Sequence, residues 1–311
     1  MITLRGLTKR YGETLAVDDL TLEIAAGKVT GFLGPNGAGK STTMRMIVGL
    51  DHPSAGEALI DGRPYGALRN PIREVGALLD AKALHPGRTA HNHLLAMAHT
   101  HGLPAKRVAE VLDTVGLATV AHRRAGGFSL GMFQRLGIAG ALLGDPRVLI
   151  FDEPVNGLDP DGVRWVRELV RSLAAEGRTI FISSHLMSEM QLTADQLVII
   201  GRGRLIADAP IAELIARSSL TAVQVRVPDP DHLATLREGL ARAGMAVREA
   251  AEDQLVVRGG DLARVGDLVH QLGVRVHELR MLEASLEEAY MELTAASVEF
   301  GVAAGGPEAR A

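Results

Sequence analysis

The sequence predicts an α/β protein followed by a smaller α+β module. Over residues 1–218, short apolar runs alternate with longer segments of helical periodicity, as in a parallel sheet covered by helices. After residue 218 the order of predicted elements changes, and so does the charge. Residues 1–218 contain 24 Lys and Arg against 22 Asp and Glu, whereas residues 219–300 contain 8 against 14. We therefore expect two domains, 1–218 and 219–300, and a disordered tail at 301–311.

In the first domain, apolar runs predict strands and periodic segments predict helices. The expected buried strands are Val29 to Leu33, Val75 to Leu79, Val148 to Phe151 and Thr179 to Ser183. The expected helices are Thr42 to Leu50, Pro104 to Val115, Leu130 to Leu143 and Gly162 to Ala175. Antiparallel strands are expected at Ile2 to Leu7 and Leu20 to Ile24, and a hairpin at Gln196 to Ile200 and Arg204 to Ala207. A helical arm is expected over about residues 85–145.

The second domain has the element order β-α-β-β-α-β, which is typical of a ferredoxin-like module. Its expected strands are Ala222 to Val227, Ala246 to Ala250, Gln254 to Arg258 and Val274 to Glu278. Its expected helices are His232 to Ala243 and Leu262 to Leu272, with a last helix at Leu282 to Thr294. Because such modules regulate, dimerise or bind ligands in different proteins, the pattern does not predict a function for this one.

Composition excludes several classes of protein. The 311 residues include no cysteine, which excludes a disulfide scaffold, a thiol nucleophile and cysteine-ligated metal. The formal net charge is −4, so we expect no nucleic-acid partner. No apolar run reaches the roughly 18–20 residues of a membrane span, and the N-terminus does not resemble a signal peptide. We expect a soluble, cytoplasmic protein.

A phosphate-binding loop (P-loop) follows the first buried strand. Gly34, Pro35, Asn36, Gly37, Ala38, Gly39, Lys40 and Ser41 match G-x-x-x-x-G-K-[ST], and Thr42 continues into the helix. Glycines let backbone N–H groups surround phosphate oxygens, and the positive helix end faces them. Lys40 adds a charged donor to the terminal phosphates, and the Ser41 hydroxyl is a predicted Mg²⁺ ligand. The loop predicts ATP or another nucleotide as the ligand.

Two carboxylates follow the strand Val148 to Phe151. Asp152 has the place of the acid that holds Mg²⁺ in P-loop enzymes. Glu153 lies just past the strand end, where ligands bind in parallel sheets, and is the candidate to polarise the attacking water. Without the P-loop, this Asp-Glu pair would be an ordinary solvated strand end.

With these motifs the sequence resembles the ATP-binding subunit of an ABC transporter over residues 1 to about 215. The resemblance implies a composite site in a dimer. Ser129 and Gly131, in the signature loop (residues 128–132), would face the γ-phosphate held by a second copy, and Asp159, in the D-loop (residues 157–160), would cross the interface. His185 would sense the γ-phosphate as the switch histidine, and Tyr11 would stack on adenine.

Two positions depart from the family pattern. The signature loop reads Phe-Ser-Leu-Gly where the family has Leu-Ser-Gly-Gly, and it keeps the Ser and Gly that face phosphate. Asp80 stands where the family has a glutamine that contacts Mg²⁺ and the membrane partner. Aspartate only accepts hydrogen bonds, whereas the glutamine amide also donates. Asp80 is therefore a third candidate Mg²⁺ ligand, and its coupling to a partner is open.

Within the family, the sequence most resembles the ATPases of daunorubicin- and bacitracin-type drug exporters. The likeness lies in Phe128 to Leu136, Gly76 to Pro86 and Leu286 to Leu293. It implies export of a drug, antibiotic or lipid through a separate transmembrane permease, with the ATPase at the cytoplasmic face of the membrane. The rival hypothesis is a soluble ABC ATPase acting on a ribosome or DNA. A P-loop kinase or GTPase is disfavoured by the signature loop and the missing Asn-Lys-x-Asp motif.

Overall fold

The structure, a computed structural model, describes residues 1–81, 84–218, 221–258, 261–282 and 284–302. The chain divides into two compact units, Met1–Ala209 and Pro210–Ala311. The division falls at the end of strand β9 (Arg204–Pro210), before the expected boundary at residue 218. Helix α8 (Ile211–Arg217) goes with the second unit because it packs against α11 (Leu286–Val302).

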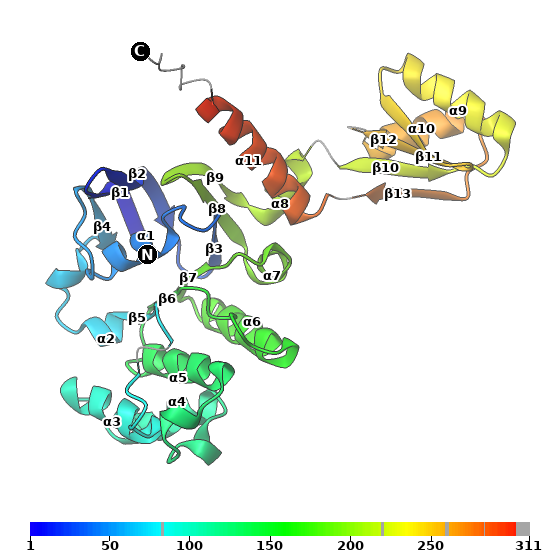
Figure 1. The fold of residues 1–311 in the computed structure, drawn as a ribbon. Coiled ribbons are helices and arrows are strands. Elements are labelled where there is room, and N and C mark those ends of the chain that lie inside the picture. The colour runs from blue at the N-terminus through cyan, green and yellow to red at the C-terminus, as the bar shows by residue number, and fades with distance from the viewer. Residues whose placement is uncertain (82–83, 219–220, 259–260, 283, 303–311) are drawn as a thin grey trace, which may run out of the picture. The chain divides into compact units, whose positions relative to one another are not determined.

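Six strands form the central sheet of the first unit, in the order β5-β6-β7-β3-β8-β9 (Figure 1). They include β3 (Val29–Leu33), β5 (Val75–Leu78), β6 (Val148–Phe151), β7 (Thr179–Ser183) and β8 (Gln196–Gly201). The first five in this order run parallel. Every residue of β3, β6 and β7 is buried, as expected for parallel strands covered on both faces. The carboxyl ends of these strands meet at one edge, and each is followed by a predicted site segment.

A second, antiparallel sheet has the order β2-β1-β4. Its strands are β1 (Ile2–Tyr11), β2 (Thr14–Ile24) and β4 (Ala55–Ile60). Helix α1 (Lys40–Ile47) packs against β2 and β4, and the two sheets share one apolar core that contains Ile2, Leu20, Phe32 and Phe181. Helices α6 (Pro160–Ala175) and α7 (Met187–Thr193) pack against the parallel sheet. The P-loop, between β3 and α1, therefore belongs to a unit in which both sheets share one core.

The helices of the arm pack on one another and on strand β5. They are α3 (Ala90–Thr100), α4 (Lys106–Thr114) and α5 (Leu130–Leu142), with the 3₁₀ turns η2 (Ala118–Val120) and η3 (Ala125–Gly127). The turn η1 (Tyr65–Ala67) and helix α2 (Pro71–Glu74) lead into β5. Helix α5 approaches β5 closely: a Cβ on Gly76 would lie 2.0 Å from the carbonyl oxygen of Ala141. Glycine at this position lets the helix that begins with the signature loop rest on the sheet.

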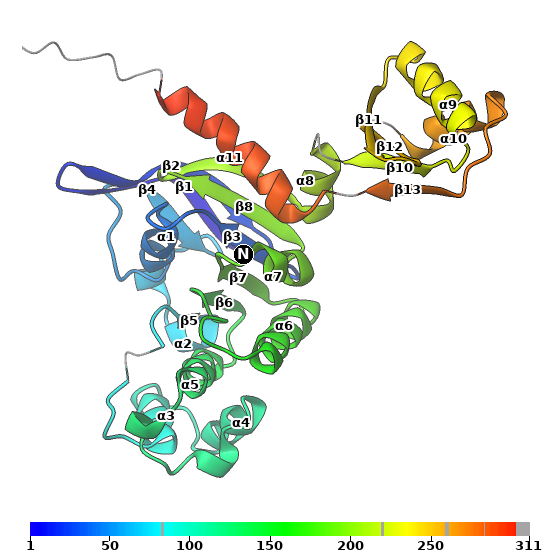
Figure 2. The same cartoon turned by 45° about the vertical axis from the view of Figure 1, so that its right-hand side comes forward.

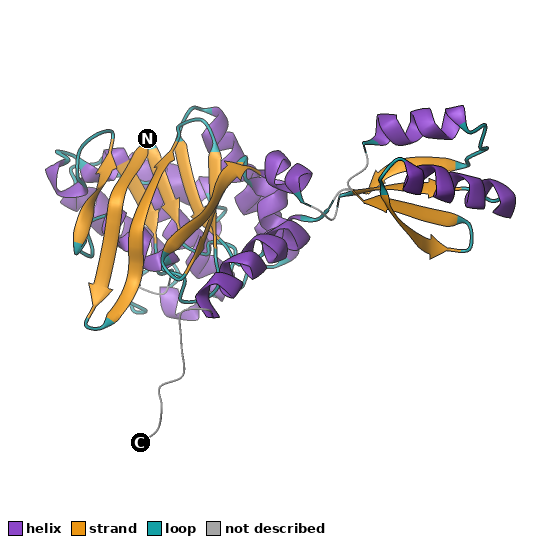
Figure 3. Cartoon of the chain, turned by 90° about the horizontal axis from the view of Figure 1, so that it is seen from above, coloured by secondary structure: helices purple, strands orange, loops and turns teal. Residues whose placement is uncertain are grey.

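The second unit has a four-stranded antiparallel sheet in the order β11-β12-β10-β13. Its elements are β10 (Ala222–Arg226), α9 (Pro230–Arg242), β11 (Ala246–Ala251), β12 (Gln254–Arg258), α10 (Leu262–Gln271) and β13 (Glu278–Leu282). Val223, Val225, Leu255 and Val257 alternate towards one face and form a core with side chains of α9 and α10. Figures 2 and 3 show the path of this sheet and its two helices. This is the β-α-β-β-α-β order predicted from the sequence.

The expected strands Val29–Leu33, Val148–Phe151, Thr179–Ser183 and Gln254–Arg258 are confirmed residue for residue. The expected strand Val274 to Glu278 is wrong, because β13 spans Glu278–Leu282. The Val274 N–H instead closes the end of α10 on the Val269 carbonyl, and only residues 278–282 lie in register with β10. The last helix correspondingly begins at Leu286 rather than Leu282.

The expected disordered tail, 301–311, lies outside the described residues except for positions 301 and 302, which end α11. Within the described residues, no helix combines the length and the hydropathy needed to cross a bilayer.

Candidate functional site

The P-loop joins β3 to α1, and its conformation requires glycine at two positions. Gly39 has φ 104° at the helix N-cap, and a Cβ there would lie 2.5 Å from the Ala16 carbonyl oxygen. A Cβ on Gly34 would lie 2.5 Å from the Ile200 carbonyl oxygen. The Lys40 ammonium donates to the Gly34 carbonyl at 2.6 Å and is 7% exposed. The loop thus curls around a buried cation at a helix N-terminus, which suits a polyphosphate.

A cavity of about 210 Å³ lies against this loop. It is lined by Ala16, Asn36, Gly37, Gly39, Lys40, Ser41, Thr42, Asp152 and Glu153. Most of the predicted P-loop residues and both predicted carboxylates therefore meet in one place. Gly34, Pro35 and Ala38 support the loop from behind: Ala38 N–H donates to the Pro35 carbonyl, and its own carbonyl accepts from Gly203.

Ser183, the last residue of β7, orients both carboxylates. Its fully buried hydroxyl donates to Asp152 Oδ1 at 2.5 Å and accepts from the Glu153 backbone N–H at 2.9 Å. The Asp152 N–H in turn donates to the Leu78 carbonyl on β5, at 2.8 Å. Three neighbouring strands therefore position the acidic pair. Sequence analysis gave Ser183 no role, although a hydroxyl at the end of an apolar strand was a usable signal.

Glu153 and His185 form a pair at the strand ends. His185 Nδ1 lies 2.8 Å from Glu153 Oε2, so a protonated Nδ1 donates to the carboxylate. Glu153 has φ 50°, a left-handed backbone conformation that is uncommon for a residue with a side chain and that occurs often at functional sites. The side chain is 21% exposed, so it can reach a ligand in the cavity. The two predicted catalytic residues are thus in direct contact.

The donor set suits Mg²⁺ bound together with a nucleotide. Ser41 and Asp152 both line this cavity and carry the oxygen atoms that would ligate the ion. Among the described residues, no group of three or more His, Asp or Glu side chains is arranged to hold a metal ion by itself. Mg²⁺ commonly uses one or two protein oxygens and completes its shell with phosphate and water, so the pair fits this ion.

A second cavity, of about 300 Å³, contains the other predicted half of the site. It is lined by Ser129, Leu130, Gly131, Met132, Arg135, Gly157, Leu158 and Asp159. Ser129 caps α5 by accepting from Met132 N–H at 3.3 Å, and Asp159 caps α6 by accepting from Gly162 N–H at 2.9 Å. Among the described residues, none lines both cavities. Within one chain, the signature loop and D-loop are separate from the P-loop.

Tyr11 ends β1 and is held by a charged cluster. Its hydroxyl donates to Asp51 Oδ2 at 2.9 Å, and the Lys9 ammonium lies 4.8 Å from the ring centre. Desolvation and the neighbouring Asp51 raise the pKa of Tyr11 above its ordinary value. The Arg45 guanidinium, 2.7 Å from Asp51, lowers the pKa of that carboxyl. Tyr11 does not line the P-loop cavity and is 46% exposed, so its contact with adenine stays a prediction.

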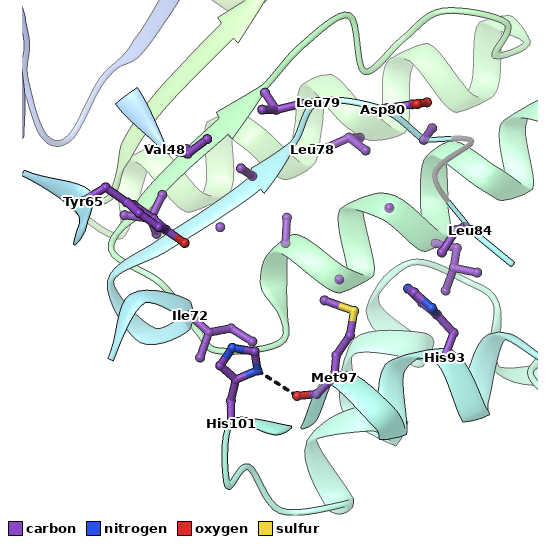
Figure 4. A pocket seen from close by; sticks show the side chains of 18 residues that line it. Val48, Tyr65, Ile72, Leu78, Leu79, Asp80, Leu84, His93, Met97 and His101 are labelled. Carbon is purple, nitrogen blue, oxygen red and sulfur yellow. Dashed lines mark hydrogen bonds between the residues drawn. The ribbon is translucent and has the colours of Figure 1, made fainter. Parts of the chain in front are cut away.

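Asp80 lies on a third cavity, a groove of about 370 Å³ between β5, α2 and the arm helices (Figure 4). The groove walls are mainly apolar, with Tyr65, Ile72, Leu84, Met97 and Leu136 among them. His93 and His101 add polar edges, and burial lowers the pKa of His93. Asp80 is exposed and lines this groove rather than the cavity that contains Ser41 and Asp152. Its role as a Mg²⁺ ligand stays a prediction.

Gln134 is a further residue that sequence analysis did not single out. It is a buried polar side chain on the otherwise apolar face of α5. Its Nε2 donates to the backbone carbonyls of Glu153 and Asn156, each at 3.4 Å. Helix α5 is therefore tied to the turn that follows the catalytic candidate.

Comparison with known proteins also indicates a nucleotide-binding protein of the ABC type. Residues 17–156 match the family model described as "ABC transporter", and residues 221–287 match a domain of unknown function, DUF8746. The chain is 37% identical over 299 residues to the bacitracin transport ATP-binding protein BcrA of Bacillus licheniformis, covering 94% of this chain and 97% of that one. It is 35% identical over 305 residues to the uncharacterized ABC transporter ATP-binding protein YhcH of Bacillus subtilis (strain 168), covering 96% and 97%.

Among solved structures, the chain is similar to the dimeric post-hydrolysis state of the ATP-binding cassette MJ0796 bound to ADP and Pi. The TM-score is 0.62 at 25% identity, covering 68% of this chain and 98% of that one. The fold and the site define a P-loop ATPase of the ABC class. The chain belongs to the family of ATP-binding proteins of ABC transporters.

Proposed function

We propose that this ATPase drives an exporter of a drug, antibiotic, lipid or similar compound. Two copies of the chain, or two related ATPase subunits, would act on a separate transmembrane permease at the cytoplasmic face of the membrane. The observation that carries the proposal is the division of ATP-handling residues between two cavities of one chain. Similarity to a bacitracin transport protein supports the substrate class.

In the proposed dimer, each ATP lies between the P-loop cavity of one chain and the signature cavity of the other. Lys40 and the loop N–H groups hold the phosphates, and the α5 N-terminus of the partner adds favourable dipole charge at the γ-phosphate. Glu153 accepts a proton from the water that attacks the γ-phosphorus, and ADP leaves from the opposite side. Mg²⁺, held through Ser41 and Asp152, would neutralise phosphate charge. His185 orients the Glu153 carboxylate through their 2.8 Å contact.

ATP favours the closed dimer because the γ-phosphate makes contacts there that the open form lacks, and hydrolysis removes them. The groove of Figure 4 is the proposed docking place of a cytoplasmic segment of the permease. Its apolar walls suit the apolar face of a helix, and Asp80 occupies the position at which the family contacts its membrane partner. Met97→Glu should abolish co-purification with the permease and leave ATP binding by the isolated chain unchanged. Retained co-purification would contradict this placement.

The test is a pull-down of the tagged Glu153→Gln protein from gently solubilised membranes of its own source, with Mg-ATP. A stoichiometric, multi-span membrane protein in the eluate is the expected result. The matched control is the Lys40→Ala protein, which should not reach the closed state. Ribosomes, DNA or no partner in the eluate would contradict the exporter and favour a soluble ABC ATPase.

A further inference from the structure

The antiparallel sheet of the second unit has two faces of different character. Successive side chains of a strand point to opposite faces, so the residues between the core valines and leucines lie on the face away from α9 and α10. Each strand places one exposed arginine on this second face, which we call the arginine face. The four are Arg248 on β11, Arg258 on β12, Arg226 on β10 and Arg280 on β13.

The pairing register places the four arginines around the middle of the face. One row across the strands consists of Arg248, Val256, Gln224 and Arg280. Arg258 lies two residues beyond Val256 on β12, and Arg226 lies two residues beyond Gln224 on β10. Each is therefore the diagonal neighbour of an arginine on the adjacent strand, about 7–8 Å away between Cα atoms. The face thus carries two diagonal arginine pairs.

Hydrogen bonds within the arginine face orient its glutamine amides. A guanidinium can only donate, and Arg280 Nε donates to Gln224 Oε1 at 2.9 Å. The Gln224 amide nitrogen therefore points the other way and donates to Gln254 Oε1 at 2.7 Å. Gln254 in turn keeps its amide nitrogen, a donor, for another partner. Because Gln224 is only 8% exposed, this order of bonds is fixed, and it suits an anion rather than a cation.

Two of the four arginines have no acidic partner. Within the part of the chain that the structure describes, no ion pair engages Arg248 or Arg258. The other two form ion pairs of 3.1 and 3.0 Å, Arg226 with Asp253 and Arg280 with Glu278. The arginine face therefore has an excess of positive charge.

The rest of the module has the opposite charge. Of the 8 Arg and 14 Asp and Glu in residues 219–300, four Arg and Glu278 lie on the arginine face, which leaves four Arg against 13 acidic residues elsewhere. Positive charge is thus concentrated on one sheet face of an acidic module. This concentration predicts an acidic partner for that face.

We infer that the arginine face binds an extended, carboxylate-rich segment of a protein partner. In an extended chain, alternate side chains point to one side and lie about 6.6 Å apart, close to the separation within each diagonal arginine pair. A guanidinium binds a carboxylate through two parallel hydrogen bonds. The two pairs are separated by two strand spacings, about 9–10 Å, so a small anion reaches one pair, whereas a segment with acidic residues at alternate positions engages both.

The charge distribution favours this narrow partner over broader ones. A membrane surface or a nucleic-acid duplex extends beyond the sheet and would bring its phosphates within a Debye length, about 8 Å at physiological ionic strength, of the acidic remainder of the module. The four strands contain no aromatic residue, so single-stranded RNA has no ring on them to stack against. Two arginine faces would repel each other, which disfavours a symmetric dimer through this surface.

The experiment measures binding of a fluorescein-labelled peptide, in which Glu and Gly alternate, to the full-length protein by fluorescence anisotropy. We expect saturable binding that weakens as salt is added. Arg248→Glu/Arg258→Glu should weaken binding by about 10-fold or more, the scale of one lost hydrogen bond to a charged group. Arg248→Lys/Arg258→Lys keeps the charge without the planar fork and should bind with intermediate affinity. ATP hydrolysis should not change, because neither arginine lines the P-loop cavity or the signature cavity.

The matched control is Arg242→Glu/Arg264→Glu, which makes the same change in net charge at exposed positions of α9 and α10. Equal weakening by the control and by Arg248→Glu/Arg258→Glu would overturn the inference, because it would show attraction by net charge alone. No peptide binding by the unaltered protein would also overturn it. A peptide of the same composition with its Glu residues in one block should bind more weakly, and equal binding would contradict recognition of alternate positions.

Two further measurements test the other occupants of the arginine face. Vesicles that contain phosphatidylglycerol should bind more weakly than the peptide, and the protein alone should sediment identically with and without the Arg248→Glu/Arg258→Glu change. Tighter binding to vesicles would assign the face to a membrane surface. Self-association that the double substitution abolishes would assign it to a second copy of the chain. Either result would overturn the proposal.

Discussion

The P-loop cavity and the signature cavity of this protein differ in what their walls can do. The first combines a cation and a hydroxyl, which follow β3, with two carboxylates, which follow β6, and this set of groups suits the binding and hydrolysis of a nucleotide. The second combines two capped helix N-termini with the Arg135 side chain and apolar side chains, which suits recognition of negative charge. In the proposed dimer, each cavity is one half of a site that two chains complete, which would explain why one fold carries both.

The largest expected effect on ATP hydrolysis comes from a change at the P-loop cavity, which contains Glu153. Glu153→Gln removes the proton acceptor and keeps the shape of the side chain, so kcat should fall by about 10²–10⁴ with ATP binding retained. Steady-state phosphate release and gel filtration with ATP measure the two properties, and the variant should accumulate as a dimer. Glu168→Gln, an exposed position on α6, is the control. Normal turnover in Glu153→Gln would return the carboxylate to a structural role.

The P-loop cavity and the signature cavity are distinguished by two measurements, ATP binding by the monomer and ATP-dependent formation of the dimer. Lys40→Ala should weaken ATP binding by the monomer by roughly 10- to 100-fold, the scale of a charge-assisted hydrogen bond. Gly131→Asp should leave monomer binding intact and prevent the ATP-dependent dimer, because it places a carboxylate beside the expected γ-phosphate.

Mixing the two inactive variants extends the test. In a mixed dimer, one site combines the intact P-loop of the Gly131→Asp chain with the intact signature loop of the Lys40→Ala chain. Part of the ATPase activity should therefore return, as measured by phosphate release against the mixing ratio. Failure to recover any activity, with mixed dimers present, would contradict the division of the site between chains.

Tyr11→Ala should have a smaller effect, a several-fold loss of ATP affinity, because it removes a ring expected to stack on adenine. Tyr11→Phe keeps the ring and loses the 2.9 Å hydrogen bond to Asp51, so it should bind ATP as the unaltered protein does. Equilibrium titration with a fluorescent ATP analogue measures both. If Tyr11→Ala binds ATP as tightly as the unaltered protein, Tyr11 has only a structural role, through its contact with Asp51.

The smallest expected effect lies outside both halves, at His93 in the groove. Burial, aided by Arg88, lowers the pKa of His93 in the folded state. Below the ordinary histidine value of about 6.5, the unfolded chain therefore binds this proton more readily than the folded chain. The contribution of neutral His93 to the free energy of unfolding is therefore present at neutral pH. It is lost as the pH falls through the pKa that His93 has in the folded protein. Urea unfolding at pH 7.5 and 5.5 should show a larger loss for the unaltered protein than for His93→Gln, with ATP affinity equal at pH 7.5.

Local patterns identified most of the residues that the structure brings together at the P-loop cavity. The P-loop and the Asp152–Glu153 pair lie within a few residues of buried strands, and apolar runs identify such strands directly. The strand expected at Val274 to Glu278 failed because its register depends on β10, some 50 residues earlier. Asp80 is a candidate Mg²⁺ ligand by its resemblance to the family pattern, and the structure places it on the groove wall, so that role stays a prediction. Sequence spacing could not reveal that direction.

By itself, the sequence determined the class of chemistry, because the P-loop and the acidic pair are short motifs whose geometry depends on neighbouring residues. Only the tertiary structure decided how those groups are oriented. Ser183 reaches Asp152 and Glu153 from the neighbouring strand β7, and Leu130, at the start of α5, fills the space beside Gly157. Contacts between distant segments depend on packing and register, which leave no periodic signal along the chain.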